Sequence, residues 1–351
     1  MNVYEYTGNL HVHTSYSDGE ALHAQVAQAA QDAGLDFIVV TDHNVWVDGL
    51  ERYYGKVLLL VGEEVHDVRR QPQANHLLIY GTEAEMVLQA KDPQVLIDEV
   101  AQHGGFCYLA HPYEYAGPFG GEEAIPWVDW DVTGYVGIEL WNYMAEFKSL
   151  ASRNVVAAVY SSFFPDRGIR GPFKDTLRHW DYLLSLDRRV PVIGAADAHA
   201  TPYSLGPLRR VLFPYEYLFR CINTHILVER PFNGFLEHDR TLVYDALRAG
   251  RTWVGYDLLA PTKGFQFLAR SGSNQTLIGG ELVRTGATIF EVHTPDEAEI
   301  RLIYNGQIVA RTRGTYLKHT TAEPGAYRVE AYRRYKLGLR GWIFSSPLYV
   351  K

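Results

Sequence analysis

Cysteine is scarce in this chain of 351 residues, which contains only Cys107 and Cys221. Two cysteines cannot form a disulfide framework or a cysteine-based zinc site. The sequence also lacks any run of about 18 apolar residues, which excludes a transmembrane helix. Its N-terminus has neither the basic region nor the apolar stretch of a signal peptide. We therefore expect a cytoplasmic protein that does not insert into a membrane.

An excess of basic residues is absent as well. The chain has 33 Lys and Arg against 41 Asp and Glu, which gives a net charge of −8. Such a chain offers no basic surface for long nucleic acid. A small anionic substrate is still compatible with this charge, because a bound metal ion can reverse the charge locally. Histidine, by contrast, is abundant: 14 are present, and several stand beside Asp or Glu.

The first 255 residues or so alternate strand-like and helix-like stretches. Phe37–Thr41 is a continuous apolar run, typical of a parallel strand buried on both faces. After the capping residues Ser17–Gly19, a helix is predicted from Glu20 to Ala33, with Gly34 as its end. Repeated strand–helix units favour a parallel sheet or an α/β barrel. Further strands are predicted at Asn9–His13, Val57–Val61, His76–Tyr80, Phe106–Ala110, Val136–Leu140 and Val190–Ala195, and further helices at Pro93–Gln102, Ala145–Tyr160, Lys174–Leu186 and Asp239–Ala249.

The pattern changes between Gly255 and Gly264. Beyond Lys263 no helical period is present, and strand-like runs alternate with turn signals such as Asn305-Gly306, which predicts a hairpin. We therefore predict two domains, an α/β domain over residues 1–258 and a small all-β domain over 259–351, interpreted as a sandwich. The run Tyr327–Tyr335 is rich in Arg and Tyr and is interpreted as a half-exposed strand.

Imidazole and carboxylate side chains gather at the ends of the predicted strands. His11 and His13 lie at i and i+2, so they point to the same face of one strand. In α/β barrels, the carboxyl ends of the strands build the active site. Mixed imidazole and carboxylate ligands suit zinc, manganese or iron. We predict a metal site built from His11, His13, His43, His76, His111 and His199 with carboxylates from Asp18, Glu63 or Glu64, and Asp197.

These motifs resemble the PHP (polymerase and histidinol phosphatase) superfamily. Asn9–Gly19 is similar to its first motif and Thr41–Asn44 to its second. Gly62–Val65 resembles the family's Gly-x-Glu motif, which selects Glu64 rather than Glu63 as a bridging carboxylate. The remaining motifs match in order at His76, Ala110-His111-Pro112 and Asp197-Ala198-His199.

The rest of the chain resembles one branch of that superfamily, the carbaryl-hydrolase-like metallohydrolases. Glu139–Asn142, Leu247–Thr252 and Trp342–Val350 are similar to segments of that branch. Ala196 stands where the branch has serine, a departure that touches no ligand, and Ser345-Ser346-Pro347 replaces its Ser-Asn-Pro.

The resemblance implies a distorted (β/α)7 barrel that holds two or three divalent ions of Zn, Mn or Fe. A metal-bound hydroxide held by Glu64 and Asp197 would be the nucleophile, because divalent ions lower the pKa of a bound water. By the family's motifs, one ion would take His11, His13, Glu64 and Asp197; a second would share Glu64 and add His76 and His111; a third would take Asp18, His43 and His199.

Further residues are candidates for supporting the ligands or contacting the substrate. Asp42 precedes a ligand, although it could instead cap the next turn. Glu139 could orient a ligand histidine or be a paired strand carboxylate. Arg69 and Arg70 could hold a phosphate, although a solvated loop pair is favoured. The other candidates are Asn142 and Tyr113. His66, two residues after Glu64 and so on the same face, could support a ligand, although an ordinary loop histidine is favoured.

Three functions fit these features. The positive metal centre favours a metal-dependent phosphoesterase acting on a small, anionic ester. The aromatic residues after His111 and the few lysines near the motifs favour a carboxyl or carbamate ester hydrolase. The third function is a binding protein with an idle metal site, which the complete ligand set opposes. An amidohydrolase would need a bridging lysine at a strand end in mid-chain, and the sequence has none there.

Overall fold

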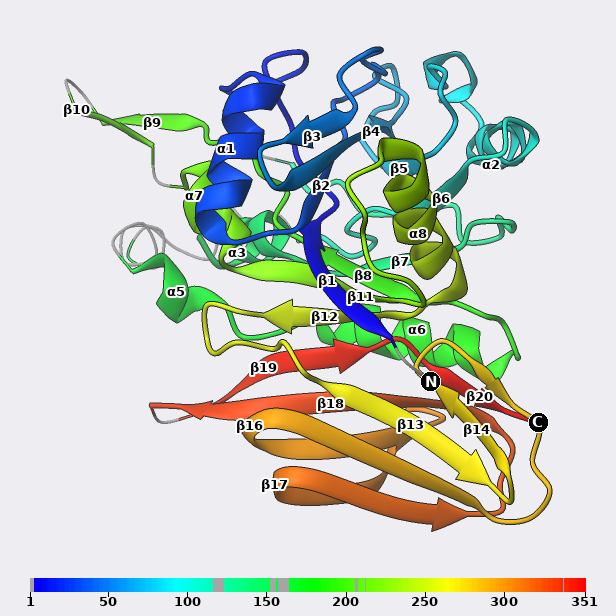
Figure 1. Cartoon of the computed structure of the whole chain (residues 1–351). Helices are drawn as coiled ribbons and strands as arrows, with labels where there is room; N and C mark the ends of the chain where they lie inside the picture. Colours follow the sequence, from blue (N-terminus) through cyan, green and yellow to red (C-terminus); the bar gives the residue numbers. More distant parts are fainter. Residues whose placement is uncertain are drawn as a thin grey trace.

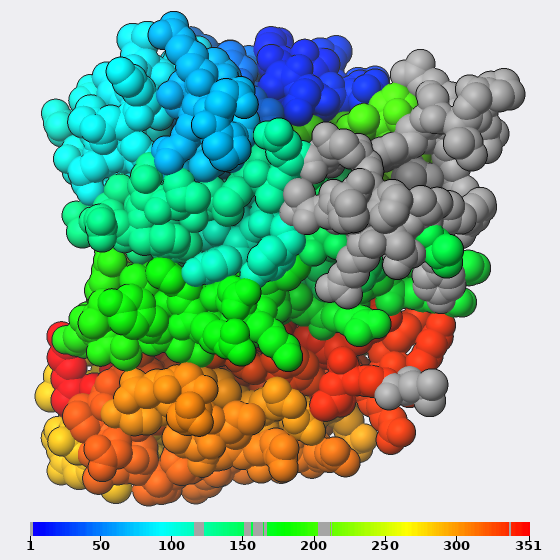
Figure 2. Space-filling model, turned by 180° about the vertical axis from the view of Figure 1, so that it is seen from behind, coloured from blue at the N-terminus to red at the C-terminus, as the bar shows by residue number. Residues whose placement is uncertain are grey.

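The protein is described from a computed structural model, over residues 3–115, 123–151, 156, 164–205, 208–211, 213–336 and 338–351. It consists of an α/β region (residues 4–256) followed by a β-only region (residues 266–350) (Figure 1). Seen from behind, the β-only region forms the base of the molecule beneath the α/β region (Figure 2). The mixed α/β class is confirmed. No helix within the described ranges combines the length and apolar character needed to cross a membrane.

Seven strands of the α/β region surround the site described below. They are β1 (Tyr4–Asn9), β2 (Phe37–Val40), β4 (Val57–Val65), β5 (Leu77–Tyr80), β6 (Phe106–Leu109), β7 (Gly137–Asn142) and β8 (Val192–Ala195). Neighbours in this order pair in parallel, except that β5 runs antiparallel to both β4 and β6, and no pairing joins β8 directly to β1 in the described chain. A parallel bridge from Val12 to Ala198 joins the segments that follow β1 and β8.

The remaining elements of the α/β region cover or extend these strands. The helices are α1 (His23–Ala33), the short 3-10 turn η1 (Val87–Gln89), α2 (Pro93–Gln102), α3 (Tyr143–Ala151), α5 (Pro165–Gly168), α6 (Lys174–Ser185), α7 (Tyr215–Phe219) and α8 (Leu236–Ala249). The strands are β3 (Arg52–Tyr54), β9 (Pro202–Leu205), β10 (Leu208–Val211), β11 (Ile222–Val228) and β12 (Thr252–Tyr256).

Helix ends follow from local chemistry. Gly34 takes the left-handed conformation (φ 85°) that ends α1, as the sequence predicts, because glycine adopts positive φ without a steric cost. Asp92 caps α2 by accepting hydrogen bonds from the backbone N–H groups of Gln94 and Val95 at 3.0 and 3.2 Å. The first helix begins at His23 rather than Glu20. Of the predicted helix 145–160, the part beyond residue 151 lies outside the described residues except for residue 156.

Two strand predictions need correction. The first strand ends at Asn9, so His11 and His13 follow it instead of lying in it. His76 precedes β5 rather than occupying it. Because β5 is antiparallel to its neighbours, its beginning lies at the edge where β4 and β6 end. His76 therefore still reaches the same edge as the other predicted ligands.

The β-only region contains β13 (Gln266–Ser271), β14 (Asn274–Leu277), β15 (Glu281–Leu282), β16 (Thr288–Tyr304), β17 (Gln307–Thr321), β18 (Gly325–Tyr335), β19 (Gly338–Ser345) and β20 (Leu348–Val350). The hairpin predicted at Asn305-Gly306 is present: Tyr304 pairs with Gln307, and both turn residues have positive φ. Strand β12 pairs with β11 on one edge and with β19 on the other, so the two regions share one continuous sheet. The domain boundary at residue 258 stays a prediction.

A buried charged cluster at His225 in β11 gives a testable pH dependence. His225 Nδ1 lies 2.9 Å from Glu5 Oε1, and its Nε2 lies 3.1 Å from Asp257 Oδ2. Burial alone would lower the pKa of His225, but these two carboxylates raise it to about 9. Because the folded pKa exceeds the unfolded value of about 6.5, the stabilisation is complete below about pH 6.5 and is lost as pH rises through about 9.

We expect His225→Gln to remove this part of the pH dependence. In urea titrations, the unfolding free energy of the unsubstituted protein should fall between pH 6.5 and 9.5 by on the order of 3 kcal/mol more than that of the variant. An equal fall in both proteins would show that His225 is not protonated in the folded state.

Candidate metal centre

Glu64, at the end of β4, is the carboxylate around which the predicted histidines gather. It is 1% exposed. Its Oε1 lies 2.8 Å from His76 Nδ1 and 3.2 Å from His111 Nε2. Its Oε2 lies 3.0 Å from His11 Nε2 and 3.1 Å from His43 Nδ1. Burial would raise the pKa of Glu64, but the surrounding imidazoles hold it well below its usual range. One ionised carboxylate thus joins imidazoles from four separate segments.

Asp197 is a second carboxylate with several imidazoles around it. Its Oδ1 lies 3.4 Å from His11 Nε2, 3.2 Å from His13 Nε2 and 3.5 Å from His199 Nδ1. His13 Nε2 also lies 3.3 Å from Glu64 Oε2, so this imidazole stands between the two carboxylates. Asp197 has a φ of 56°, a left-handed conformation that aspartate tolerates better than most residues. The backbone turns at this point, directly after β8.

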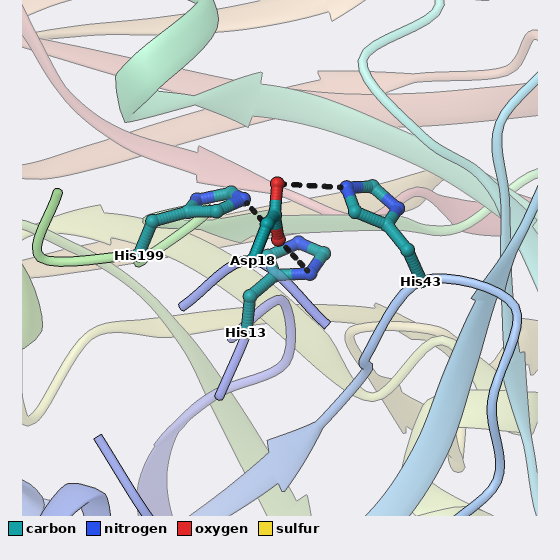
Figure 3. A group of neighbouring side chains, drawn as sticks. All are labelled: His13, Asp18, His43 and His199. Carbon is teal, nitrogen blue, oxygen red and sulfur yellow. Dashed lines mark ion pairs between the residues drawn. The ribbon is translucent and has the colours of Figure 1, made fainter. Parts of the chain in front are cut away.

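Asp18, in the loop after His13, approaches the imidazoles of His13, His43 and His199 (Figure 3). Its Oδ1 lies 3.2 Å from His199 Nε2 and 3.8 Å from His13 Nδ1, and its Oδ2 lies 3.7 Å from His43 Nε2. Burial would raise the pKa of Asp18, but the His199 hydrogen bond and the charges of all three imidazoles lower it. Asp18 is the more exposed end of the group, with 56% of its side chain accessible.

Glu139, in β7, is buried and contacts two of the predicted ligands. Its Oε1 lies 3.1 Å from His11 Nδ1, which leaves His11 Nε2 facing Glu64. Its Oε2 accepts the backbone N–H of His111 at 2.8 Å and the side-chain amide of Asn142 at 3.0 Å. Asn142 Nδ2 also reaches Asp197 Oδ2 at 3.3 Å. Such buried partners fix the orientation of ligand side chains.

Asp42 fixes the loop that carries two of the predicted ligands. Its Oδ1 accepts hydrogen bonds from the Thr14 backbone N–H and the Ser17 hydroxyl, both at 2.7 Å. Its Oδ2 accepts the Thr14 hydroxyl at 2.7 Å. Both carboxylate oxygens are therefore engaged in holding the segment between His13 and Asp18.

The donor atoms fit divalent cations. Among the described residues, buried atoms without a hydrogen-bond partner include His11 Nε2, both ring nitrogens of His13, His43 Nδ1 and Glu64 Oε2. These atoms lie near each other without hydrogen-bond geometry, and unpartnered buried polar atoms are costly. Donor sets within 4.8 Å of one another, such as His11 with Glu64 and His111, or His11 with His13 and Asp197, would satisfy them by binding a cation. Imidazole and carboxylate donors together suit zinc, manganese or iron.

The buried carboxylates raise the pKa of His11 and His13. Burial would lower the pKa of His11, but Asp197, Glu64 and Glu139 raise it well above its usual value. Burial is likewise outweighed at His13, where the nearby carboxylates of Asp197 and Glu64 raise the pKa to about 9. Metal binding should therefore displace protons from these imidazoles, which makes affinity fall at low pH.

A cavity of about 300 Å³ opens onto this centre. Its walls combine metal-centre residues with side chains from α3 and from the loop after His111. Lys148 Nζ lies 2.9 Å from Glu114 Oε1 on this wall. The described lining consists of Asp18, His43, Glu64, His76, His111, Asp197 and His199 with Glu114, Ile125, Met144, Ala145, Lys148 and Thr201.

Part of the chain matches a known protein family. Residues 9–146 match the PHP domain. This part of the chain is thus similar to the PHP domain. Together with the donor geometry above, this match supports a metal-dependent hydrolase. The narrower resemblance to the carbaryl-hydrolase-like branch stays a prediction.

Two solved structures bear a distant likeness to the chain. One is a two-domain protein from Bacteroides vulgatus that contains a predicted PHP-like metal-dependent phosphoesterase, with 16% identity over 99% of this chain and 96% of that chain and a TM-score of 0.44. The other is a candidate metal-dependent phosphoesterase from Bifidobacterium adolescentis, with 15% identity over 57% of this chain and 90% of that chain and a TM-score of 0.35. Neither likeness is close enough to carry an argument about function. A comparison with curated proteins finds no match.

Three residues proposed to contact the substrate lie away from the described cavity lining. Arg70 pairs with Asp129 at 2.7 Å, and Arg69 is exposed in the same loop. The Tyr113 hydroxyl lies 3.3 Å from His179 Nδ1, and its ring stacks on Trp130. None of the three is among the described residues that line the cavity.

The sequence did not predict the lysine that lines the cavity, Lys148. It has few lysines near the motifs, yet α3 places Lys148 on the cavity wall. The only available signal was its spacing, because Lys148 follows Met144 by four residues and therefore shares a helix face with it. Glu114, its partner, lies three residues after the predicted ligand His111.

Proposed function

We propose that this protein is a metal-dependent phosphoesterase that hydrolyses a small phosphate ester. The observation that carries the proposal is the cavity, in which a cluster of metal donors and the cation of Lys148 face one volume of about 300 Å³. That volume suits a small molecule, since ligand pockets begin at about this size. A phosphate would meet positive charge from the cations on one side and from Lys148 on the other.

The grouping of the donor side chains supports the predicted assignment of ligands to three cations. His11, His13, Glu64 and Asp197 would hold one, Glu64 with His76 and His111 a second, and Asp18, His43 and His199 a third. Divalent cations here would supply a water of lowered pKa and stabilise negative charge on the phosphoryl oxygens. Glu139 keeps His11 and Asn142 in place, and Asp42 keeps the His13–Asp18 loop in place. Lys148 would orient the anionic substrate.

We also infer a distorted (β/α)7 barrel for the α/β region and a sandwich for the β-only region. The order of the seven strands and the bridge from Val12 to Ala198 support the barrel, and the antiparallel β5 is its distortion. The separate apolar core of the β-only region, with Phe267, Phe290 and Val329 among its fully buried residues, supports the sandwich.

Hydrolysis of p-nitrophenyl phosphate and p-nitrophenyl acetate, measured side by side after manganese or zinc loading, tests the proposal. Chelator-sensitive release from the phosphate ester supports it. Release from the acetate alone would identify a carboxyl ester hydrolase, which the apolar wall of Ile125, Met144 and Ala145 favours. Bound metal with no turnover of either ester would contradict the proposal in favour of a binding protein.

Lys148→Gln should weaken binding of the phosphate ester specifically. A hydrogen bond to a charged group contributes about 1.5–3 kcal/mol, so KM for the phosphate ester should rise about tenfold to hundredfold. The unpaired Glu114 would then add repulsion for an anion. Hydrolysis of the neutral acetate ester should not show this rise. The matched control is Lys174→Gln, an exposed lysine on α6, and an equal KM in the two variants would contradict a role for Lys148.

A further inference from the structure

His66 lies beside the metal centre but outside the predicted ligand set. It follows β4 directly, two residues after Glu64. In extended chain, side chains two residues apart point to the same side. The sequence left open a supporting role for His66 and favoured an ordinary loop histidine; its place in the loop beside Glu64 agrees with either interpretation.

Three imidazoles meet at this point. One ring nitrogen from each of His43, His66 and His76 lies within 4.8 Å of the other two. The His66 ring stacks on His76 with centroids 4.1 Å apart and 13° between the planes. It meets His43 edge-on, at 5.0 Å and 87°. Ring nitrogens that approach this closely from three segments can surround a single cation.

Each of these imidazoles has one buried ring nitrogen without a hydrogen-bond partner. Among the described residues, His43 Nδ1, His66 Nδ1 and His76 Nε2 are buried and accept or donate no hydrogen bond. A buried polar atom left without a partner costs about 1–3 kcal/mol. Three such atoms on adjacent rings indicate a ligand that satisfies them together.

The backbone holds this arrangement in place. The His66 backbone N–H donates to the Asn44 side-chain oxygen at 3.0 Å. The Asn44 backbone N–H donates to the Glu64 carbonyl oxygen, also at 3.0 Å. Asn44 itself takes a left-handed conformation with φ 55°, which asparagine tolerates. The segments that carry His43 and His66 are thus tied to each other by two hydrogen bonds.

We propose that His66 is a metal ligand and that it forms, with His43 and His76, a three-imidazole site for a divalent cation. Three nitrogen donors select zinc, cobalt, nickel or copper over magnesium or calcium, which require oxygen. The proposal rests on the metal binding in the proposed function, but it is independent of the substrate. His43 and His76 are shared with the predicted ligand sets, so His66 enlarges the same centre.

Cobalt(II) titration of the chelator-treated full chain tests this ligand. The readouts are the number of ions bound, their affinity and the cobalt absorption spectrum. His66→Phe keeps a stacking ring but removes both nitrogens. His66→Cys replaces the nitrogen by a thiolate, which binds cobalt and adds a sulfur-to-cobalt charge-transfer band. The matched control is His23→Phe, at another buried histidine whose ring nitrogens lack partners and which lies in none of the donor sets of the described residues.

In His66→Phe we expect one fewer bound ion or an affinity at least tenfold lower at one site, with His23→Phe unchanged. In His66→Cys we expect the charge-transfer band, which neither Cys107 nor Cys221 should produce in the unsubstituted protein. Unchanged count, affinity and spectrum in His66→Phe, or no new band in His66→Cys, would overturn this proposal and leave the phosphoesterase proposal standing. An unsubstituted protein that binds no cobalt, manganese or zinc would overturn both. Unfolding curves of the metal-free variants verify that each one folds.

Discussion

Glu64→Gln should abolish metal-dependent hydrolysis, with kcat/KM lower by about 10³-fold or more. The substitution keeps the shape of the side chain but removes the one negative charge that lies within 3.3 Å of five imidazoles. An amide also presents N–H groups to nitrogens that should bind metal. Loss of a single preorganised polar group in other active sites costs about 10²–10³ in rate, and here the change disturbs every ion that shares this carboxylate. Metal content and kcat/KM, measured on the same preparation, test the expectation.

The adjacent carboxylate provides a matched control. Glu63 is equally buried, but its Oε2 accepts the Met86 backbone N–H at 2.9 Å, and burial raises its pKa to about 7. It is in none of the donor sets of the described residues. Glu63→Gln should therefore keep metal content and activity. Full metal content and activity in Glu64→Gln would contradict the site as assigned.

Much of the metal centre could be predicted because its residues follow strands in the sequence. A strand end is recognisable from an apolar run, and neighbouring strands deliver their ends to one edge. The nine predicted ligands are accordingly close together. His76 is an exception, because it lies before a strand instead of after one. That strand, β5, is antiparallel to its neighbours, and the pattern of apolar residues does not distinguish an antiparallel strand from a parallel one.

The substrate side of the cavity could not be predicted in the same way. Lys148 and Glu114 meet because α3 packs beside the loop that follows His111, and no spacing in the sequence encodes that contact. Glu139 presented a related difficulty. Its place in a predicted strand left open whether it orients a ligand histidine or is a paired strand carboxylate, and does not predict that one carboxylate contacts a histidine ring, a backbone N–H and an amide at once.

In the β-only region, the exposure of Arg328 was also predicted incorrectly from the sequence. The sequence interpretation of Tyr327–Tyr335 as half-exposed is wrong for its first part, since Arg328 is 2% exposed and its neighbours in β18 are buried. Strand β18 is central, paired with β16 and β19, and α6 covers one of its faces at the junction of the two regions (Figure 1). Alternation indicates exposure only where one face of a sheet is free.

This burial leads to the second large expected effect: Arg328→Ala should lower the free energy of unfolding by about 3–5 kcal/mol. The Arg328 guanidinium binds Asp181 of α6 through two hydrogen bonds, at 2.7 and 2.8 Å, and Glu330 through a third at 2.6 Å. It also lies over the Trp180 ring, 4.6 Å from its centroid. Removing the cation leaves two carboxylates that are mostly out of water, and an uncompensated buried charge is far more costly than a broken surface pair.

Urea unfolding of four variants, namely Arg328→Ala, Asp181→Ala, their double variant and Arg334→Ala, separates this charge effect from simple loss of packing. Arg334→Ala, at an exposed position of the same strand, should change stability by no more than about 0.5 kcal/mol. Adding Asp181→Ala to Arg328→Ala removes one of the stranded carboxylates, so the double variant should be more stable than the sum of the two single changes predicts. Additive losses would mean that the pair has no coupling, and a loss below about 1 kcal/mol in Arg328→Ala would contradict the burial of this charge. If the coupling is found, the ion pair between β18 and α6 is a main contact that fastens the β-only region to the region that carries the metal centre.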